Sequence, residues 1–171
     1  MGQKHTISCL VENHFGVLCR VAGLISARGF NIDSLTVGET EDPSASRMTI
    51  VVDADERTLE QVKKQLNRLI DVIKVQELKD GEFIDRELIL IKVAVTPAKR
   101  GEVMQITETF QSKVVDVNPK TVTVECSGDQ GKINAFMEVM KPFGIKEVVR
   151  TGRIALARGT TKEAAKEEAG P

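Results

Sequence analysis

The sequence predicts an α+β protein made of two tandem units, each with the element order β-α-β-β-α-β. Stretches with alternating apolar residues, typical of strands, are interspersed with stretches whose apolar residues recur at the spacing of a helix. The same order of stretches recurs on both sides of a short polar segment at residues 79–82. Since 41% of the 171 residues are hydrophobic, the chain can form one compact domain or two small ones, each with a modest core.

The elements of the first unit follow from local patterns. Residues 5–11 are rich in apolar and β-branched residues and predict a strand. Asn13 and His14 come next, and either one can cap the helix that follows; Arg28 and Gly29 are typical of its end. The remaining elements are expected as strands at residues 31–40, 47–53 and 72–78 and as a helix at about residues 56–70. This order is the split β-α-β arrangement of ferredoxin-like folds, with four antiparallel strands and two helices on one side.

The second unit begins after residues 79–82, which form the expected hinge. The long strand within residues 83–95 is mostly apolar on both faces, which predicts burial on both sides and indicates an interface. The other elements are expected as helices at residues 101–110 and 132–140 and as strands at residues 113–117, 121–126, 145–150 and 154–156. We therefore expect a first domain at residues 4–79, a second at residues 83–159 and a charged, solvated tail at residues 160–171.

Composition and charge argue against several classes of function. The chain has 24 Lys and Arg against 25 Asp and Glu and no Trp or Tyr, so it lacks both the basic excess and the stacking platforms of most nucleic-acid-binding proteins. No apolar run approaches the ~20 residues that span a bilayer. The N-terminus lacks the basic and then apolar order of a signal peptide. We expect a cytoplasmic protein that binds neither nucleic acid nor membrane.

The cysteines and histidines give no sign of a disulfide framework or a metal centre. The three cysteines stand far apart without a CxxC pair. Cys9 and Cys126 alternate in phase with apolar strand neighbours and are expected in the core, whereas Cys19 lies off the apolar stripe of its helix and is expected to be partly exposed. His5 and His14 lack the spacing of metal ligands. We expect no metal site.

Residues 128–132 resemble a phosphate-binding loop only faintly. The full spacing of that motif is absent, and Ile133 stands where the motif has a hydroxyl for Mg²⁺. No motif of a catalytic nucleophile occurs elsewhere. We therefore expect a turn that caps the last helix, and no catalytic residue.

The junction of the first strand and the first helix carries a candidate binding site. Gly16 lies where the first amides of the helix point outward, which suits a carboxylate, and glycine has no Cβ to block a ligand. Asn13 can donate to a carboxylate and accept from an ammonium group, which suits an amino acid. Asn31, at the start of the second strand, offers a second amide side chain. A purely structural interpretation stays open, in which Asn13 caps the helix and Gly16 only shapes the loop.

The same segment resembles a known family. Glu12-Asn13, Gly16-Val17-Leu18 and the run from residue 31 to residue 37 are similar to the ACT domain of acetolactate synthase small subunits. The resemblance continues through the second unit and covers residues 4–159. A generic ACT domain would share only the glycine region and the topology, whereas the run at residues 31–37 is specific to this family.

The resemblance implies an N-terminal ACT domain that forms a homodimer side by side and binds valine, or leucine or isoleucine, between the two chains. Gly38 matches a position that often holds alanine, so the pocket is expected to be looser here. The effector-binding positions that the resemblance implies are Asn13, Gly16, Val17 and Leu18 in the loop, Asn31 and Ile32 from the facing chain, and Gly38 on the second strand.

The resemblance further implies a regulatory subunit that is not itself catalytic. Its partner would be the catalytic large subunit of acetolactate synthase, which holds thiamine diphosphate, Mg²⁺ and FAD and condenses pyruvate with pyruvate or 2-oxobutyrate. No cofactor is expected on this chain. The small subunit is expected to raise the activity of its partner and to confer feedback inhibition.

Two rival functions fit the same fold less well. A small enzyme such as an acylphosphatase would need an arginine in the loop at residues 13–16, and Arg20 instead lies within the helix. A ligand-responsive DNA-binding regulator would need a basic reading element, and neither terminus supplies one.

Overall fold

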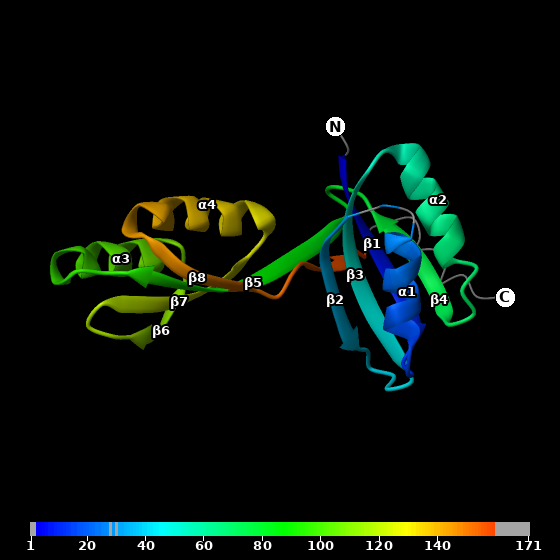
Figure 1. Cartoon of the computed structure of the whole chain (residues 1–171), viewed down its shortest axis with the longest axis horizontal. Helices are drawn as coiled ribbons and strands as arrows, with labels where there is room; N and C mark the ends of the chain where they lie inside the picture. Colours follow the sequence, from blue (N-terminus) through cyan, green and yellow to red (C-terminus); the bar gives the residue numbers. More distant parts are fainter. Residues whose placement is uncertain (1–2, 28, 30, 160–171) are drawn as a thin grey trace. The chain divides into compact units, whose positions relative to one another are not determined.

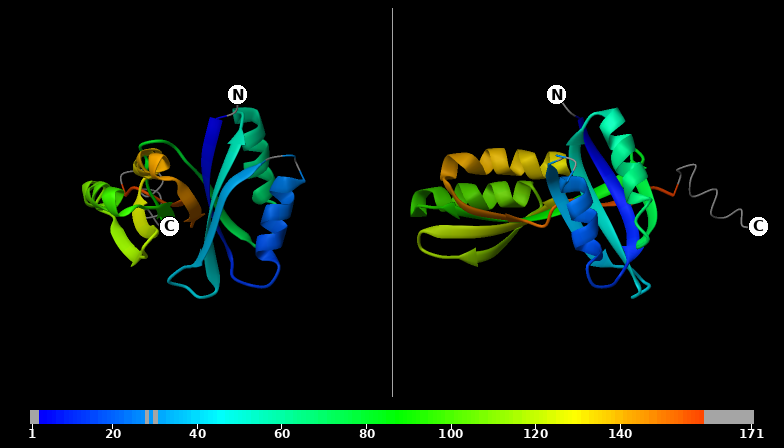
Figure 2. Two further views of the ribbon diagram at one scale, coloured as in Figure 1. Left: turned by 60° about the vertical axis from the view of Figure 1, so that its left-hand side comes forward. Right: turned by 45° about the vertical axis from the view of Figure 1, so that its right-hand side comes forward.

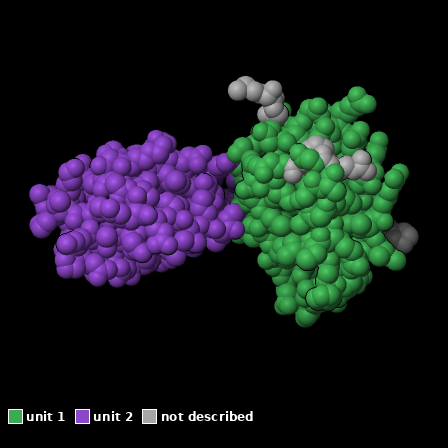
Figure 3. All heavy atoms as spheres, viewed as in Figure 1, with its two compact units in different colours: residues 1–84, 153–171 green, residues 85–152 purple. Residues whose placement is uncertain are grey.

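The computed structural model describes residues 3–27, 29 and 31–159, so Arg28 and the expected tail lie outside the described residues. The described chain forms two compact units (Figure 3). Of the described residues, those up to 84 and those at 153–159 make up the first unit, and residues 85–152 make up the second. The two β-α-β-β-α-β units expected from the sequence are both present.

The first unit is a four-stranded antiparallel sheet with two helices on one face (Figures 1 and 2). The strand order is β2-β3-β1-β4, which places β2 and β4 at the edges. The pairing of β1 with β3 runs without interruption from Gln3 opposite Ala54 to Glu12 opposite Ala45. The elements are β1 (Gln3–Glu12), α1 (Val17–Ser26), β2 (Ile32–Glu39), β3 (Ala45–Ala54), α2 (Glu56–Leu66) and β4 (Val72–Leu78).

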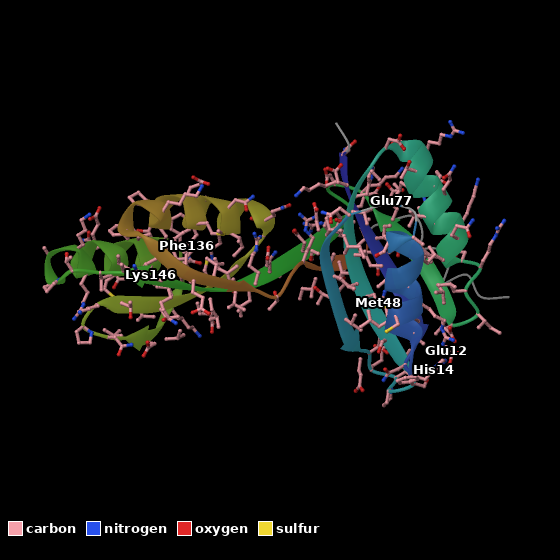
Figure 4. The ribbon with its side chains drawn as sticks, in the orientation of Figure 1. Glu12, His14, Met48, Glu77, Phe136 and Lys146 are labelled. Carbon is pink, nitrogen blue, oxygen red and sulfur yellow. The ribbon has the colours of Figure 1, made fainter. Side chains whose placement is uncertain are left out.

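Alternation along β1 creates the core of this unit. Every second residue of β1 turns toward the helices, and Ile7, Cys9 and Val11 are fully buried there. Figure 4 places Met48 of β3 beneath α1 in the same core. Each such side chain contributes about 1.5–3 kcal/mol by leaving water. Burial also raises the pKa of the Cys9 thiol to about 12, so this cysteine is a core residue as expected.

The second helix is shorter than the expected span of about 56–70. It begins at the Asp55 cap, whose carboxylate accepts a hydrogen bond from the amide of Thr58 at 2.8 Å. It ends at Leu66 because the next residues form tight turns, in which the amide of Leu69 bonds to the carbonyl of Leu66. The apolar residues at 69 and 70 continue the helical spacing, so the sequence pattern predicts a helix that extends beyond its actual end at Leu66.

The second unit repeats the topology of the first (Figures 1 and 2). Its strand order, β6-β7-β5-β8, corresponds to that of the first sheet. Helix α3 begins at Pro97, four residues before the expected start, because proline at the first helical position needs no amide partner. The elements are β5 (Phe83–Ala94), α3 (Pro97–Thr109), β6 (Lys113–Val117), β7 (Thr121–Gly128), α4 (Gln130–Met140), a 3₁₀ turn (Lys141–Phe143), β8 (Ile145–Arg150) and β9 (Ile154–Ala157).

Strand β5 is buried on one face only within the single chain. Ile89, Ile91 and Val93 are fully buried against α3 and α4, together with Phe136. Leu90, on the opposite face, is 37% exposed. The expectation of burial on both faces is therefore wrong for the single chain, because both helices of this unit pack on the same side of the sheet.

The strand expected at residues 154–156 is present as β9 and pairs with β5, but residues 153–159 group with the first unit and not with the second. They lie against the helix-free face of the first sheet. The amide of Arg153 donates to Ser34 Oγ at 2.9 Å, and its guanidinium donates to Thr6 Oγ1 at 2.8 Å. The amide of Ala155 meets Thr49 Oγ1 at 3.4 Å. These contacts explain why Thr6 and Thr49 are each only 4% exposed on a face that no helix covers.

Candidate functional site

The loop between β1 and α1 has a backbone conformation that requires glycine. Gly16 occupies the cap position of α1 with φ 87° and ψ −11°, in the left-handed region. No side chain caps the helix, so its first amides are available as donors. The amide of Val17 reaches only the carbonyl of His14, at 3.5 Å. The N-terminus of α1 therefore remains uncapped, and a helix N-terminus attracts anions.

Asn13 does not cap α1, so that structural interpretation is wrong. Its amide nitrogen donates instead to the carbonyl of Pro43 at 2.9 Å and to Glu39 Oε1 at 3.2 Å. Glu39 ends β2, and Pro43 lies in the β2–β3 connection, which is itself ordered by Asp42 and Ser44. Hydrogen bonds from the hydroxyl and then the amide of Ser44 hold the pKa of Asp42 below its usual range. Asn13 therefore joins the Gly16 loop to the end of β2.

A charged cluster that the sequence did not reveal fixes the same loop. Asp71 is 7% exposed, and its two carboxylate oxygens face the side chains of His14 and Arg20. His14 Nε2 lies 3.0 Å from Oδ1, and Arg20 Nε lies 2.9 Å from Oδ2. The carbonyl of Asp71 also accepts a hydrogen bond from the amide of Glu12 at 2.8 Å. Figure 4 shows Glu12 and His14 together at this end of the first sheet.

The side chains of the other loop positions differ in what they can offer to a ligand. Val17 is 3% exposed and packs in the core, so its side chain is not available to a ligand. Leu18 is 43% exposed and presents an apolar side chain beside the loop. A Cβ added to Gly38 would meet nothing within 4 Å, so packing within the chain does not require glycine there.

The candidate residues on β2 lie at opposite ends of that strand. Gly38 stands opposite Arg47 and next to Glu39, which Asn13 contacts. Ile32 stands opposite Val52, six strand positions or about 20 Å away from Gly38 along β2. The structure thus brings Gly38 close to the loop and leaves Asn31 and Ile32 apart from it within one chain.

At the far end of the sheet, Asn31 belongs to a small polar group. Its amide nitrogen donates to Asp33 Oδ1 at 3.1 Å, and Lys4 Nζ lies 3.0 Å from Asp33 Oδ2. Figure 4 labels Glu77 near this end, well away from Glu12 and His14. The candidate positions therefore form two separate groups in a single chain.

The remaining candidate motifs take structural roles. Asp129 caps α4 by accepting a hydrogen bond from the amide of Lys132 at 2.8 Å, so the segment caps the last helix as expected, although that helix begins at Gln130 and not at Lys132. Cys126 is buried and Cys19 is exposed, as expected. Within residues 3–27, 29 and 31–159, no three His, Cys, Asp or Glu side chains gather in a way that could hold a metal ion. No described helix has the length and apolarity needed to cross a membrane.

Comparison with known proteins identifies the family. A family model described as the AHAS small subunit-like ACT domain matches residues 7–74, and one described as the small subunit of acetolactate synthase matches residues 86–159. A protein of Archaeoglobus fulgidus named probable acetolactate synthase small subunit is 52% identical over 159 residues, covering 93% of this chain and 99% of that protein. This chain belongs to the acetolactate synthase small subunit family.

Further relatives agree with this assignment. The acetolactate synthase small subunit of Aquifex aeolicus is 54% identical over 158 residues, covering 91% of this chain and 82% of that protein. The crystal structure of the acetolactate synthase small subunit from Thermotoga maritima superposes with a TM-score of 0.85 at 37% identity, covering 93% of this chain and 99% of that one. The family and the fold inferred from the sequence are thus confirmed. Membership implies a regulatory subunit with an ACT domain, without a cofactor of its own, and with a catalytic large subunit as partner.

Proposed function

We propose that this chain raises the activity of the catalytic subunit of acetolactate synthase and makes that activity sensitive to valine or a related branched-chain amino acid. The observation that carries the proposal is the left-handed Gly16 at the uncapped head of α1, in a chain of this family. An uncapped helix N-terminus that begins at a glycine, which has no Cβ to block a ligand, suits the carboxylate of a small amino acid.

The loop offers complementary groups for each part of such an effector. The effector carboxylate meets the amides at Gly16 and Val17. The amide nitrogen of Asn13 is engaged by the chain itself, so its carbonyl oxygen is the atom that accepts from the effector ammonium group. The exposed side chain of Leu18 provides apolar contact for the branched side chain.

The second half of the site is proposed to come from another copy of the chain. Strand β2 is at the edge of its sheet and can pair with a second β2. A two-fold axis across an antiparallel pair brings the start of one strand beside the end of the other. Asn31 and Ile32 of one chain then approach Gly38 and the Gly16 loop of its partner, which unites the two groups that lie apart in a single chain. The effector site therefore needs a homodimer.

An effector bound between two chains favours one dimer geometry over another. It can shift the catalytic partner only by the difference in its affinity for the two geometries, typically ~1–3 kcal/mol. Thiamine diphosphate, Mg²⁺ and FAD belong in this proposal to the large subunit, which works with this chain in the cytoplasm.

Two experiments on the full-length chain test the proposal. The immobilised chain is expected to capture a thiamine-diphosphate-dependent enzyme that forms acetolactate from pyruvate. Calorimetric titration with valine, leucine and isoleucine is expected to give saturable heat for at least one of them, with one site for each Gly16 loop. Failure to capture such an enzyme contradicts the assigned partner. Absence of heat and of any thermal shift with all three amino acids contradicts the effector site.

A further inference from the structure

The space above Gly16 is bordered by one charged group. A Cβ built on Gly16 would lie 4.0 Å from Nη2 of Arg20 and would meet no other atom that close, apart from the neighbouring residues of the chain. Arg20 follows Gly16 by one helical turn, and its amide bonds to the carbonyl of Gly16 at 3.0 Å. Its side chain is 49% exposed, so a ligand can reach it. A ligand that uses the missing Cβ of Gly16 therefore comes next to the guanidinium of Arg20.

The guanidinium of Arg20 is held in this position through its Nε atom, which faces Asp71. Nε of Arg20 lies 2.9 Å from Asp71 Oδ2, and His14 Nε2 occupies the second oxygen of the same carboxylate at 3.0 Å. Asp71 is itself fixed by burial and by the hydrogen bond from the amide of Glu12. Because the arginine is oriented before a ligand arrives, less side-chain entropy is lost when it binds.

We propose that Arg20 recognises the carboxylate of the effector, with Asp71 as its positioning residue, an assignment that rests on the proposed function of the Gly16 loop. With Nε turned toward Asp71, the terminal nitrogens remain to donate to a second carboxylate, and a planar guanidinium suits that group better than an ammonium does. The site then selects free α-amino acids over derivatives whose carboxylate is neutralised. Arg20 is thus a specificity-determining residue, although its position within the helix argues against an enzyme such as an acylphosphatase.

A comparison of two ligands separates recognition from a structural role. Valine and valinamide have the same side chain and ammonium group, and only valine carries a carboxylate. Arg20→Met keeps most of the apolar stem and removes the donors. It is expected to weaken the binding of valine by about 10-fold, or about 1.4 kcal/mol, and to change the binding of valinamide by less than about 2-fold. Arg57→Met, at an exposed position on α2, is the matched control and should change neither.

Two further variants test the geometry with the fold preserved. Arg20→Lys keeps the charge beside Asp71 and loses the planar fork, so valine binding should fall by less than in Arg20→Met, with valinamide again unaffected. Asp71→Asn should weaken the binding of valine but not that of valinamide, because an amide forms a weaker hydrogen bond with Nε of Arg20 than a carboxylate does. Circular dichroism and urea unfolding establish that each variant is folded.

The outcomes are distinguishable. If Arg20→Met and Arg20→Lys weaken the binding of valine and valinamide equally, or leave both unchanged, Arg20 does not recognise the carboxylate. The proposed function of the Gly16 loop is not contradicted by that result. If the wild-type chain binds valinamide as tightly as valine, the assignment of Arg20 also fails. If the wild-type chain binds no amino acid at all, the proposed function itself fails and this assignment fails with it.

Discussion

Replacing Gly16 by Asp is the substitution whose effect the structure defines most sharply. The backbone at Gly16 is left-handed, so any side chain introduces strain as well as chemistry. Gly16→Asn is the matched control, because Asn and Asp have the same shape and both tolerate this backbone region better than other residues do. The two variants therefore share the strain and the added volume, and they differ in one negative charge and in the amide donors that Asn carries in its place.

The difference between the two variants can be worked out from the site. Two like charges about 4 Å apart repel by about 1 kcal/mol in bulk water and by about 4 kcal/mol at an effective dielectric constant of about 20. The loop is open to solvent on one side, so the penalty for the effector carboxylate should lie between these limits. An Asp at this position would also face Nη2 of Arg20, which lies 4.0 Å from the new Cβ. Both effects oppose binding, and valine affinity should be about 5-fold to about 1000-fold lower for Gly16→Asp than for Gly16→Asn.

Calorimetry with valine measures this difference directly. Urea unfolding of both variants should show a similar loss of stability, on the order of 1 kcal/mol, from the shared backbone strain. In a reconstituted enzyme, valine sensitivity should follow the same order once each variant is normalised to its own rate without valine. Equal valine affinity in the Asp and Asn variants would refute the reasoning, because it would mean that no carboxylate binds near this loop.

Three other substitutions or treatments test the fold. Phe136 is fully buried and packs edge-on against Phe110 with ring centroids 5.2 Å apart, so Phe136→Ala should lower the free energy of unfolding by about 3–5 kcal/mol; a loss below about 1 kcal/mol in urea would contradict this packing. The hydrogen bond from Thr58 lowers the pKa of Asp55, so the cap stabilises the fold above the ordinary Asp pKa of about 3.9 and is lost as pH falls through the lower folded value. The melting temperature of Asp55→Ala should therefore fall below that of the wild type at neutral pH and converge with it in strong acid; a gap that persists there would contradict the assigned cap. Burial raises the pKa of Cys9 to about 12, so a thiol reagent at mildly alkaline pH should modify only Cys19 in the folded chain and all three cysteines after unfolding; rapid native modification of Cys9 would contradict its burial.

Local patterns were sufficient to predict the order of elements. Ile7, Cys9 and Val11 alternate because one face of β1 meets the helices, and that alternation is visible in the sequence itself. Gly16 and Asn31 were also recognisable, because their meaning depends on their immediate neighbours and on a family-specific run. The sequence-based start of α3 was late because Pro97 was not recognised as a first helical residue.

Contacts between distant segments could not be predicted in the same way. Asp71 lies more than fifty positions beyond His14 and Arg20, and no periodicity connects them. The helical spacing between Gly16 and Arg20 is the one signal that could have drawn attention to that arginine. The docking of Arg153 onto hydroxyl groups of the first sheet likewise depends on tertiary structure, since Thr6 and Ser34 read locally as ordinary polar strand residues.

The rate of acetolactate formation by the catalytic large subunit tests the central claim most directly. It should be measured with that subunit alone, with this chain added, and with this chain and valine together. We predict that the chain raises the rate and that valine lowers the raised rate toward that of the large subunit alone, with leucine and isoleucine ranked in the same assay. A rate that does not change on addition of the chain, or a raised rate that none of the three amino acids lowers, would contradict the account.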